Sequence, residues 1–242
     1  MKGLFVIGTD TGVGKTLVCS LLMAAASPQV RYWKPVQTGE DDDTATVRAL
    51  ARQPAQRCVG EGVRLTLAAS PHHAAEVQGL ELTLEPLLAL AARHAAPGAR
   101  FVVEGAGGLC VPLSRTLLQT DLVKRLGLPV LLVASTRLGT INHTLLTLRE
   151  LERQQIPTLG IVLSGASDPA VRSGIAAHGL VPIVASIPDL AGELGEPGDD
   201  ALVAGLLRGT PGEGTWTPKE RPAVAFWGRI LLQVPAIRAA LM

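Results

Sequence analysis

The sequence predicts an α/β fold in which helices cover both faces of a mostly parallel sheet. Several short apolar runs lack any alternation of polar and apolar residues, which is the pattern of strands buried on both faces. Helix-like segments separate these runs, as in a parallel sheet with crossover helices. Functional groups are then expected at the carboxyl ends of the strands. The clearest runs are RFVVEG (100–105), PVLLVAS (129–135), TLGIVLSG (158–165) and VPIVASI (181–187).

The N-terminal part supplies the first elements of this sheet. LFVIG (4–8) predicts a strand and GKTLVCSLLMAAA (14–26) predicts a helix. VRYWK (30–34) follows as a short strand. DTATVRALARQ (43–53) contains good helix formers and begins with Asp and Thr, either of which can cap a helix. This order of elements predicts a strand–helix–strand–helix start to the chain.

The C-terminal half continues the alternation and then changes character. Helices are expected near 119–127, 140–154 and 168–178, between the later strands. Residues 191–222 are rich in Gly, Pro, Asp and Glu. We therefore expect irregular chain there, with a short helix near 199–207.

An apolar tail, AVAFWGRILLQVPAIRAALM (223–242), ends the sequence. We interpret it as a terminal helix packed on the body of the protein or on a neighbouring subunit. A helix lying on a membrane surface is the alternative, which is disfavoured because only two Arg residues decorate it. The domain prediction is one α/β domain over 1–208 and a C-terminal extension of unknown role over 209–242.

Composition narrows the class of protein. The 242 residues have a formal net charge of +1 and only 3% aromatics, so no nucleic acid or anionic membrane is expected as the main partner. Three dispersed cysteines, Cys19, Cys58 and Cys110, do not form a disulfide framework. The apolar N-terminal run stops at Ile7, and no apolar stretch reaches the ~18 residues of a membrane span. We expect a cytoplasmic protein.

GTDTGVGKT (8–16) is typical of a phosphate-binding loop. Gly12 and Gly14 allow the tight curl of backbone around phosphate oxygens. Lys15 is placed to reach the terminal phosphates of a nucleotide, and Thr16 to bind Mg²⁺ through its hydroxyl. The loop runs into a helix N-terminus, so backbone amides face the anion. The motif predicts nucleotide binding without naming a reaction.

KPVQTG (34–39) places a second lysine at the carboxyl end of a strand. Beside a phosphate loop, Lys34 can stabilise the charge that builds on a transferring phosphoryl group. The alternative is a surface lysine whose stem lies over the sheet. Thr38 follows with a hydroxyl that can hold a small polar substrate, although it could equally be an ordinary turn residue.

Two acidic segments predict a metal site. EDDD (40–43) precedes a helix, where carboxylates complement the helix dipole, and Asp43 is the candidate Mg²⁺ ligand. FVVEGAGG (101–108) is an apolar strand that ends in an acid and then glycines. Glu104 can bind Mg²⁺ directly or through water. The glycines after it allow a ligand to approach the backbone closely.

Taken together, these motifs resemble the dethiobiotin synthetase family. The resemblance extends from residue 4 to about residue 208 and implies a P-loop NTPase-like fold. The matching stretches, in order, are GTDTGVGKT, KPVQTG, DTATVRAL, SPHHAA, VVEGAGGLCVPLS, LPVLLVAS, LGTINHTLLT, GIVLSG and SIPDL.

The resemblance implies an ATP- and Mg²⁺-dependent ring closure in biotin biosynthesis. One amine of 7,8-diaminopelargonic acid takes up CO₂, supplied with bicarbonate, as a carbamate. ATP phosphorylates the carbamate, and the other amine then closes the ureido ring of dethiobiotin and releases phosphate. On this reading, the phosphate loop delivers a phosphoryl group to a carbamate.

The resemblance also implies roles for residues of this chain. Lys34, Lys15 and Thr11 would act on the reacting groups, with Thr11 and Thr38 at the substrate head. Thr16, Asp43 and Glu104 would hold Mg²⁺. The implied ATP contacts are Gly12, Val13, Gly14, Lys15, Thr16, Leu17, Asp43, Glu104, Gly105, Ala106, Gly107, Ser164, Gly165, Ile187, Pro188 and Asp189.

A later segment implies a homodimer with the active site at its interface. In the family, this segment comes from the neighbouring subunit, and its helix N-terminus receives the substrate carboxylate. Asn142 could also simply cap that helix. Ser164 stands where many members of the family have Asn, which leaves the nucleotide preference open. The implied substrate contacts of the segment are Leu138, Gly139, Thr140, Ile141 and Asn142.

Two other classes of protein remain as alternatives. An amide-forming enzyme of the cobyrinic acid synthase type usually carries a further glutaminase domain with a nucleophilic cysteine, for which this chain is too short. A switch ATPase that acts on protein partners usually has an extra lysine near the start of its phosphate loop. Asp10 stands at that place here, which disfavours the switch.

Overall fold

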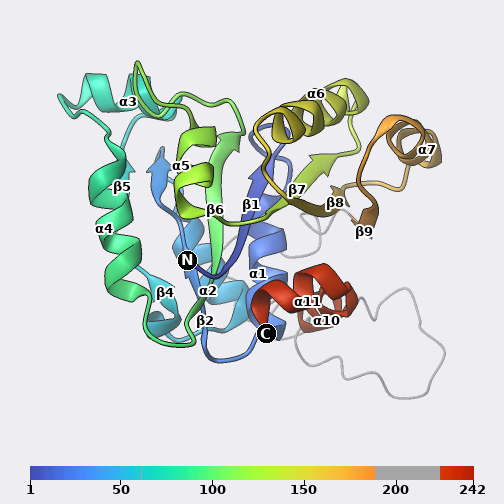
Figure 1. The fold of residues 1–242 in the computed structure, drawn as a ribbon, viewed down its shortest axis with the longest axis horizontal. Coiled ribbons are helices and arrows are strands. Elements are labelled where there is room, and N and C mark those ends of the chain that lie inside the picture. Colours follow the sequence, from blue (N-terminus) through green and yellow to red (C-terminus); the bar gives the residue numbers. More distant parts are fainter. Residues whose placement is uncertain (61, 189–223) are drawn as a thin grey trace.

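Seven parallel strands form the main sheet of this computed structural model, which describes residues 1–60, 62–188 and 224–242. Their order across the sheet is β4-β2-β6-β1-β7-β8-β9 (Figure 1). Every neighbouring pair is parallel, which confirms the predicted sheet. The strands are β1 (Gly3–Gly8), β2 (Val30–Trp33), β4 (Cys58–Val59), β6 (Arg100–Gly108), β7 (Val130–Ser135), β8 (Thr158–Ser164) and β9 (Ile183–Ile187).

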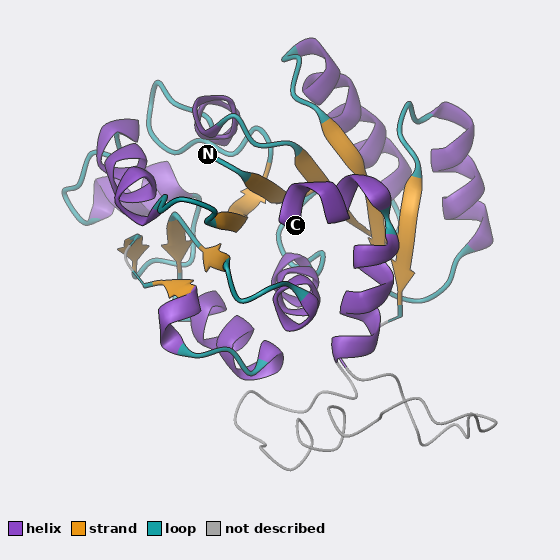
Figure 2. Cartoon of the chain, turned by 60° about the horizontal axis from the view of Figure 1, so that its bottom comes forward, coloured by secondary structure: helices purple, strands orange, loops and turns teal. Residues whose placement is uncertain are grey.

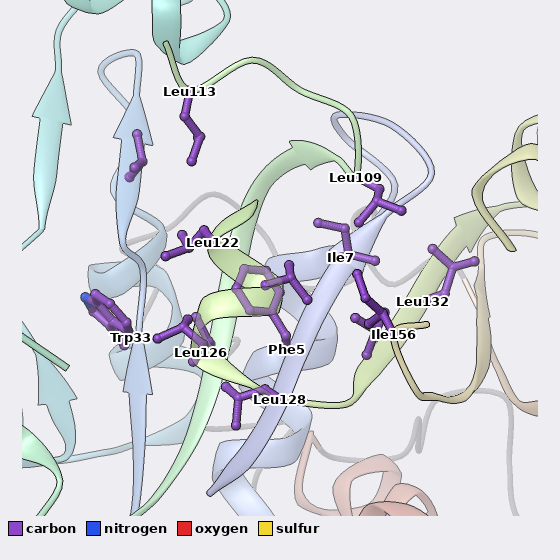
Figure 3. Close-up of a cluster of buried hydrophobic side chains, with 14 of the residues drawn as sticks. Phe5, Ile7, Trp33, Leu109, Leu113, Leu122, Leu126, Leu128, Leu132 and Ile156 are labelled. Atoms are coloured by element: carbon purple, nitrogen blue, oxygen red, sulfur yellow. The ribbon is translucent and has the colours of Figure 1, made fainter. Parts of the chain in front are cut away.

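The two faces of the sheet bury two separate apolar clusters. Side chains alternate along β1, so that Phe5 and Ile7 enter one cluster while Leu4 and Val6 enter the other. Figure 3 shows Phe5 and Ile7 in the first cluster, together with Trp33 of β2. All five side chains are essentially inaccessible to solvent, which explains why the strands appear in the sequence as continuous apolar runs.

Helices cover both faces, as Figures 1 and 2 show. The face of Phe5 is covered by α4 (Leu84–His94), α5 (Gln119–Leu126), α6 (Thr140–Arg153) and α7 (Pro169–His178), and a shorter helix at residues 71–77 adds Ala74 and Ala75 to the same cluster. The face of Leu4 is covered by α1 (Lys15–Ala25), α2 (Asp43–Ala51), α10 (Val224–Gln233) and α11 (Pro235–Leu241). The bounds of α1, α2, α5, α6 and α7 lie within three residues of the predicted ones; α4 was not predicted.

A second, two-stranded sheet was also not predicted. Parallel strands β3 (Val36–Thr38) and β5 (Val63–Leu65) form it. The short helix η1 (Ala55–Arg57) lies between these two strands in the sequence, and α3 (Pro71–Val77) follows them. Each strand has only three residues, too few for a pattern in the sequence. The small sheet carries Thr38 and the chain that follows β5 to the rim of the main sheet.

The C-terminal tail packs on the body of the protein, as predicted, but as two helices. α10 ends before Pro235, which begins α11, because proline cannot continue the hydrogen bonding of a helix interior. Leu231, Ile237 and Leu241 are fully buried in the cluster of Leu4. The guanidinium of Arg100, the first residue of β6, donates to the Ala240 carbonyl at 3.1 Å. The tail therefore reaches the amino end of the sheet.

Two further predictions concern the region around residues 191–222. The short helix predicted near 199–207 lies outside the described residues, as does Asp189.

In the part of the chain that the structure describes, no helix is both long and apolar enough to cross a membrane.

Candidate active site

The phosphate loop joins β1 to α1 at the carboxyl edge of the sheet. Gly12 and Gly14 adopt left-handed backbone conformations, with φ of 69° and 97°. A Cβ on Gly14 would also lie 2.5 Å from Oγ of Ser164, at the end of β8. Position 14 therefore requires glycine for two reasons, and the close approach places Ser164 directly beside the loop.

Lys15 is buried where the loop enters α1. Its Nζ donates to the Asp10 carbonyl at 3.0 Å, across the curl of the loop. Burial lowers the pKa of Lys15, and the nearby charge of Lys34 lowers it further, while the carboxylates of Glu104 and Asp43 oppose both effects. This ammonium therefore faces the cavity with little solvation of its own.

A compact ionic cluster lies next to Lys15. Nζ of Lys34 is 2.5 Å from Asp43 Oδ2 and 2.9 Å from Glu104 Oε1, and it also donates to the Gly105 carbonyl at 3.2 Å. The hydroxyl of Thr16 lies 3.0 Å from Asp43 Oδ1 and 2.9 Å from Glu104 Oε1. Four side chains from four separate stretches of sequence thus form one cluster.

The strand register explains why Lys34 meets Glu104. Trp33 of β2 pairs with Val103 of β6, so the next residues along these parallel strands are Lys34 and Glu104. On the other side of β6, Glu104 pairs with Val6 of β1, two residues before the phosphate loop. The sheet order therefore assembles the lysine, the acid and the loop.

Asp43 reaches the cluster from the first turn of α2. The residue that caps this helix is Asp42, whose side chain accepts from the Ala45 amide at 2.8 Å. The sequence predicts a capping Asp or Thr at residue 43 or later. This prediction is wrong, because the cap lies at Asp42. Because Asp42 fills the cap, the carboxylate of Asp43 is available to Lys34 and Thr16.

The electrostatics of the cluster favour the charged forms of Lys34 and Asp43. Burial alone would lower the pKa of Lys34, but the carboxylates of Glu104 and Asp43 raise it above its usual value. Burial alone would raise the pKa of Asp43, but the ammonium of Lys34 lowers it, with help from the Thr16 hydrogen bond. We therefore treat the pair as an ammonium and a carboxylate at neutral pH.

The donor atoms of the cluster suit magnesium. Thr16, Asp43 and Glu104 offer only oxygens, and Mg²⁺ is typically held by one or two carboxylates together with substrate phosphates and water. No group of three or more His, Cys, Asp or Glu side chains able to hold a metal occurs among the described residues. Within those residues, protein side chains alone therefore do not surround a metal ion. The three oxygen donors fit a magnesium site whose other ligands come from a bound nucleotide and water.

A cavity of about 1060 Å³ opens over this cluster. Its walls combine the phosphate loop, the ionic cluster, the end of β6, the small sheet and the chain after β5. The predicted site residues that line it are Thr11, Gly12, Gly14, Lys15, Thr16, Lys34, Thr38, Asp43, Glu104, Ala106 and Gly107. The cavity therefore brings predicted phosphate and metal residues together with Thr11 and Thr38, the residues predicted at the substrate head.

The sequence did not single out two glutamines that support these walls. Gln37 lines the cavity and donates to the Thr38 carbonyl at 3.1 Å. Gln119 of α5 is buried, accepts from the Ala106 amide at 2.7 Å and donates to the Gly108 carbonyl at 2.8 Å. Gln119 can contact Gly108 because β6 (Arg100–Gly108) continues past residue 105, where the predicted strand ends. Nothing in the sequence indicates this continuation.

Other predicted contacts lie away from the cavity walls. Val13 is buried and Leu17 packs on the cluster of Leu4, so these two residues could contact a nucleotide only through their backbone. Gly165 follows Ser164 at the end of β8. Ile187 and Pro188 lie at the end of β9, where Ile187 is buried and Pro188 exposed.

The five residues 138–142 do not line the cavity of their own chain. They form the turn into α6, where Leu138 is completely exposed and Asn142 is exposed as well. Gly139 caps the helix in a left-handed conformation, so Asn142 is not its cap. The Thr140 hydroxyl donates to the Ser135 carbonyl at 2.6 Å, which fixes the turn to the end of β7.

Comparisons with known proteins point to one family. A family model described as an AAA domain matches residues 2–194. The ATP-dependent dethiobiotin synthetase BioD of Paramagnetospirillum magneticum is 42% identical over 211 residues, which cover 87% of this chain and 95% of that protein. BioD of Rhodopseudomonas palustris (strain BisA53) is 43% identical, covering 77% of this chain and 85% of that protein.

One relative is much longer. The biotin biosynthesis bifunctional protein BioCD of Bordetella avium is 46% identical over 78% of this chain, but the match spans only 40% of that protein. Solved structures give the fold class. The cell division ATPase MinD of Pyrococcus furiosus superimposes with a TM-score of 0.58 at 16% identity, covering 97% of this chain and all of that one. A ParA family ATPase of Chlorobium tepidum gives 0.55 at 11% identity, with 95% and 99% covered.

Proposed function

The chain belongs to the dethiobiotin synthetase family, and we propose that it converts 7,8-diaminopelargonic acid, CO₂ and ATP into dethiobiotin, ADP and phosphate. The observation that carries the proposal is the ionic cluster of Lys34, Asp43 and Glu104, which lies beside Lys15 in a single cavity. Such a cluster can handle a phosphoryl group and a carboxylated amine at the same time.

The residues of the cavity have different roles in the proposed phosphoryl transfer. Lys15 and the loop amides hold the terminal phosphates of ATP. Thr16, Asp43 and Glu104 would hold Mg²⁺, which when bound neutralises phosphate charge and orients the transferring group. Lys34, next to both carboxylates, balances the negative charge of the carbamate and of the moving phosphoryl group.

The proposed order of bond changes is the one that the family resemblance implies. One amine of the substrate adds to CO₂ and loses a proton to form a carbamate. A carbamate oxygen then attacks the γ-phosphorus, and ADP leaves. The second amine attacks the carbamate carbon and expels phosphate, which closes the ureido ring. Thr11 and Thr38, which both line the cavity, would hold the diamine end of the substrate.

The substrate tail ends in a carboxylate, which hydrogen-bond donors have to hold. We propose that the exposed turn at residues 138–142 supplies them to the active site of a second copy of the chain. Its backbone amides at the start of α6 suit a carboxylate. The full exposure of Leu138 supports this proposal, because a turn that docks on a second copy has to be accessible. We also propose a cytoplasmic enzyme, since all three cysteines are free thiols.

The test is phosphate release from Mg-ATP with and without 7,8-diaminopelargonic acid and bicarbonate. We expect release only with both, and one dethiobiotin for each phosphate. A Lys124→Ala variant is the matched control, because this exposed lysine contacts Gln154 far from the cavity. Steady phosphate release that ignores the diamine would reject the synthetase and favour a switch ATPase.

A further inference from the structure

Glu104 has two carboxylate oxygens with different surroundings. Oε1 faces the cavity, where Lys34 and Thr16 both lie 2.9 Å away. Oε2 faces the protein interior and accepts a hydrogen bond from the Tyr32 hydroxyl at 2.9 Å. Glu104 and Tyr32 are both fully buried. The phenol therefore contacts the acid from the side that no substrate reaches, and Tyr32 is not among the residues that line the cavity.

Strand geometry makes this contact specific. Tyr32 lies in β2, and Lys34 directly follows that strand. Side chains two residues apart in an extended chain point to the same side, while Trp33 between them packs in the opposite cluster. Tyr32 pairs with Val102 and Trp33 with Val103, which leaves Glu104 within reach of both the phenol and the ammonium. The end of β2 and the residue after it thus supply a partner to each oxygen of Glu104: Tyr32 to Oε2 and Lys34 to Oε1.

A second interior group lies near the same acid. Cys19, one turn after Thr16 on α1, is fully buried, and its thiol lies near enough to Glu104 to feel the charge of that carboxylate. Burial, together with the Glu104 charge, raises the pKa of the Cys19 thiol and of the Tyr32 phenol well above their usual values. Both groups therefore keep their protons and can only be donors toward the carboxylate.

We propose that Tyr32 is a positioning residue of the metal site, whose hydroxyl orients Glu104 so that Oε1 faces Thr16 and Asp43. This rests on the magnesium site proposed above. A buried carboxylate oxygen that loses its hydrogen-bond donor is left unsatisfied, which is unfavourable, so the present orientation of Glu104 would be less stable without the Tyr32 hydroxyl. Groups that orient a metal ligand from behind typically change metal affinity about 10- to 100-fold when removed.

The test is Tyr32→Phe, which removes one oxygen and keeps the ring. Calorimetry would measure the affinity for a non-hydrolysable ATP analogue with Mn²⁺ and, separately, with a chelator. The factor by which Mn²⁺ tightens nucleotide binding should fall about 10-fold or more in the variant. The affinity without metal should stay as in the native chain, since Tyr32 does not line the cavity.

Two further variants calibrate the result. Thr120→Val removes another buried hydroxyl, which donates to the Leu109 carbonyl at 2.9 Å, and should leave the Mn²⁺ factor unchanged. Glu104→Gln should abolish most of that factor. Should Tyr32→Phe fail to fold, Tyr32→Met, which also lacks the hydroxyl, is measured in its place and should reduce the Mn²⁺ factor as well.

The outcomes separate the two proposals. A native chain whose nucleotide affinity ignores Mn²⁺ would overturn the magnesium site and with it the role of Tyr32. A native chain that responds to Mn²⁺, with the same factor in Tyr32→Phe, would overturn the role of Tyr32 alone. Equal weakening with and without metal would show that Tyr32 serves only the stability of the fold, and would also overturn its positioning role.

Discussion

Lys34 lies at the centre of a nearly charge-balanced group. Two ammonium groups, Lys15 and Lys34, face two carboxylates, Asp43 and Glu104, in surroundings that are largely buried. Burying ions is unfavourable unless they are paired and hydrogen-bonded, and each of these ions has a polar partner. Bound phosphates are negative and a bound metal ion is positive. The lysines can therefore pair with phosphates and the carboxylates with the metal, so that no buried ion is left unpaired.

We expect Lys34→Ala to lower kcat by about 10²–10³-fold, the usual effect of removing a group that stabilises transition-state charge. Nucleotide affinity should change far less, because Lys15 and the loop amides hold the phosphates. Steady-state kinetics beside calorimetric titration with an ATP analogue measures both. Equal losses in kcat and in affinity would contradict the assignment of Lys34 to the transition state.

One strand pair and two helices hold this group, with Asp43 presented by the first turn of α2. β2 and β6 present Lys34 and Glu104, and α1 presents Lys15 and Thr16 from the end of the phosphate loop. α10 in turn packs against α1 on its outer side. A Cβ on Gly228 would lie only 2.0 Å from the Leu21 carbonyl oxygen, so the two helix backbones are in very close contact.

Gly228→Leu should therefore destabilise the protein, by about 1–3 kcal/mol as for other overpacked sites. The side chain would force α10 away from α1. Urea unfolding measures the change. Gly60→Ala is the matched control, because nothing lies within 4 Å of the Cβ it would add and its φ is not positive. A Gly228→Leu variant as stable as the native chain would show that α10 contributes little to the fold.

At the scale of the whole molecule, the sheet order places a site made from five stretches of sequence at one edge. The buried strands were predictable because each is a continuous apolar run, and the motifs gave Lys15, Lys34 and Glu104 individually. Their contacts were not predictable without the register of β2 on β6, which no local pattern encodes. The same holds for Tyr32, which looks in the sequence like any other buried strand residue.

Some misses had a local signal and others had none. Pro235 marks the break in the C-terminal tail and could have divided the predicted helix. The run of acids at 40–43 leaves the capping residue ambiguous, because Asp42 and Asp43 are equally good caps by type. The small sheet of β3 and β5 lacks any signal, since three-residue strands are stabilised by their surroundings rather than by their own sequence.

The ionic cluster should also appear in the stability of the whole chain toward acid. The pKa of Asp43 is depressed by Lys34, so its contribution is present above the unfolded value of about 3.9 and is lost as pH falls through the lower folded value. The difference in free energy of unfolding between the native chain and Asp43→Asn should therefore shrink below about pH 4. Urea unfolding over a pH series measures it, and a difference independent of pH would contradict the depressed pKa.

The most direct measurement of the proposed chemistry follows one oxygen. With ¹⁸O-labelled bicarbonate and CO₂, the carbamate carries labelled oxygens, and the one that attacks phosphorus leaves with the phosphate. We expect each phosphate released to contain one ¹⁸O, with another in the ureido carbonyl of dethiobiotin. Phosphate without ¹⁸O, formed while the label remains in the bicarbonate pool, would mean that water attacks ATP and that no carbamate is phosphorylated.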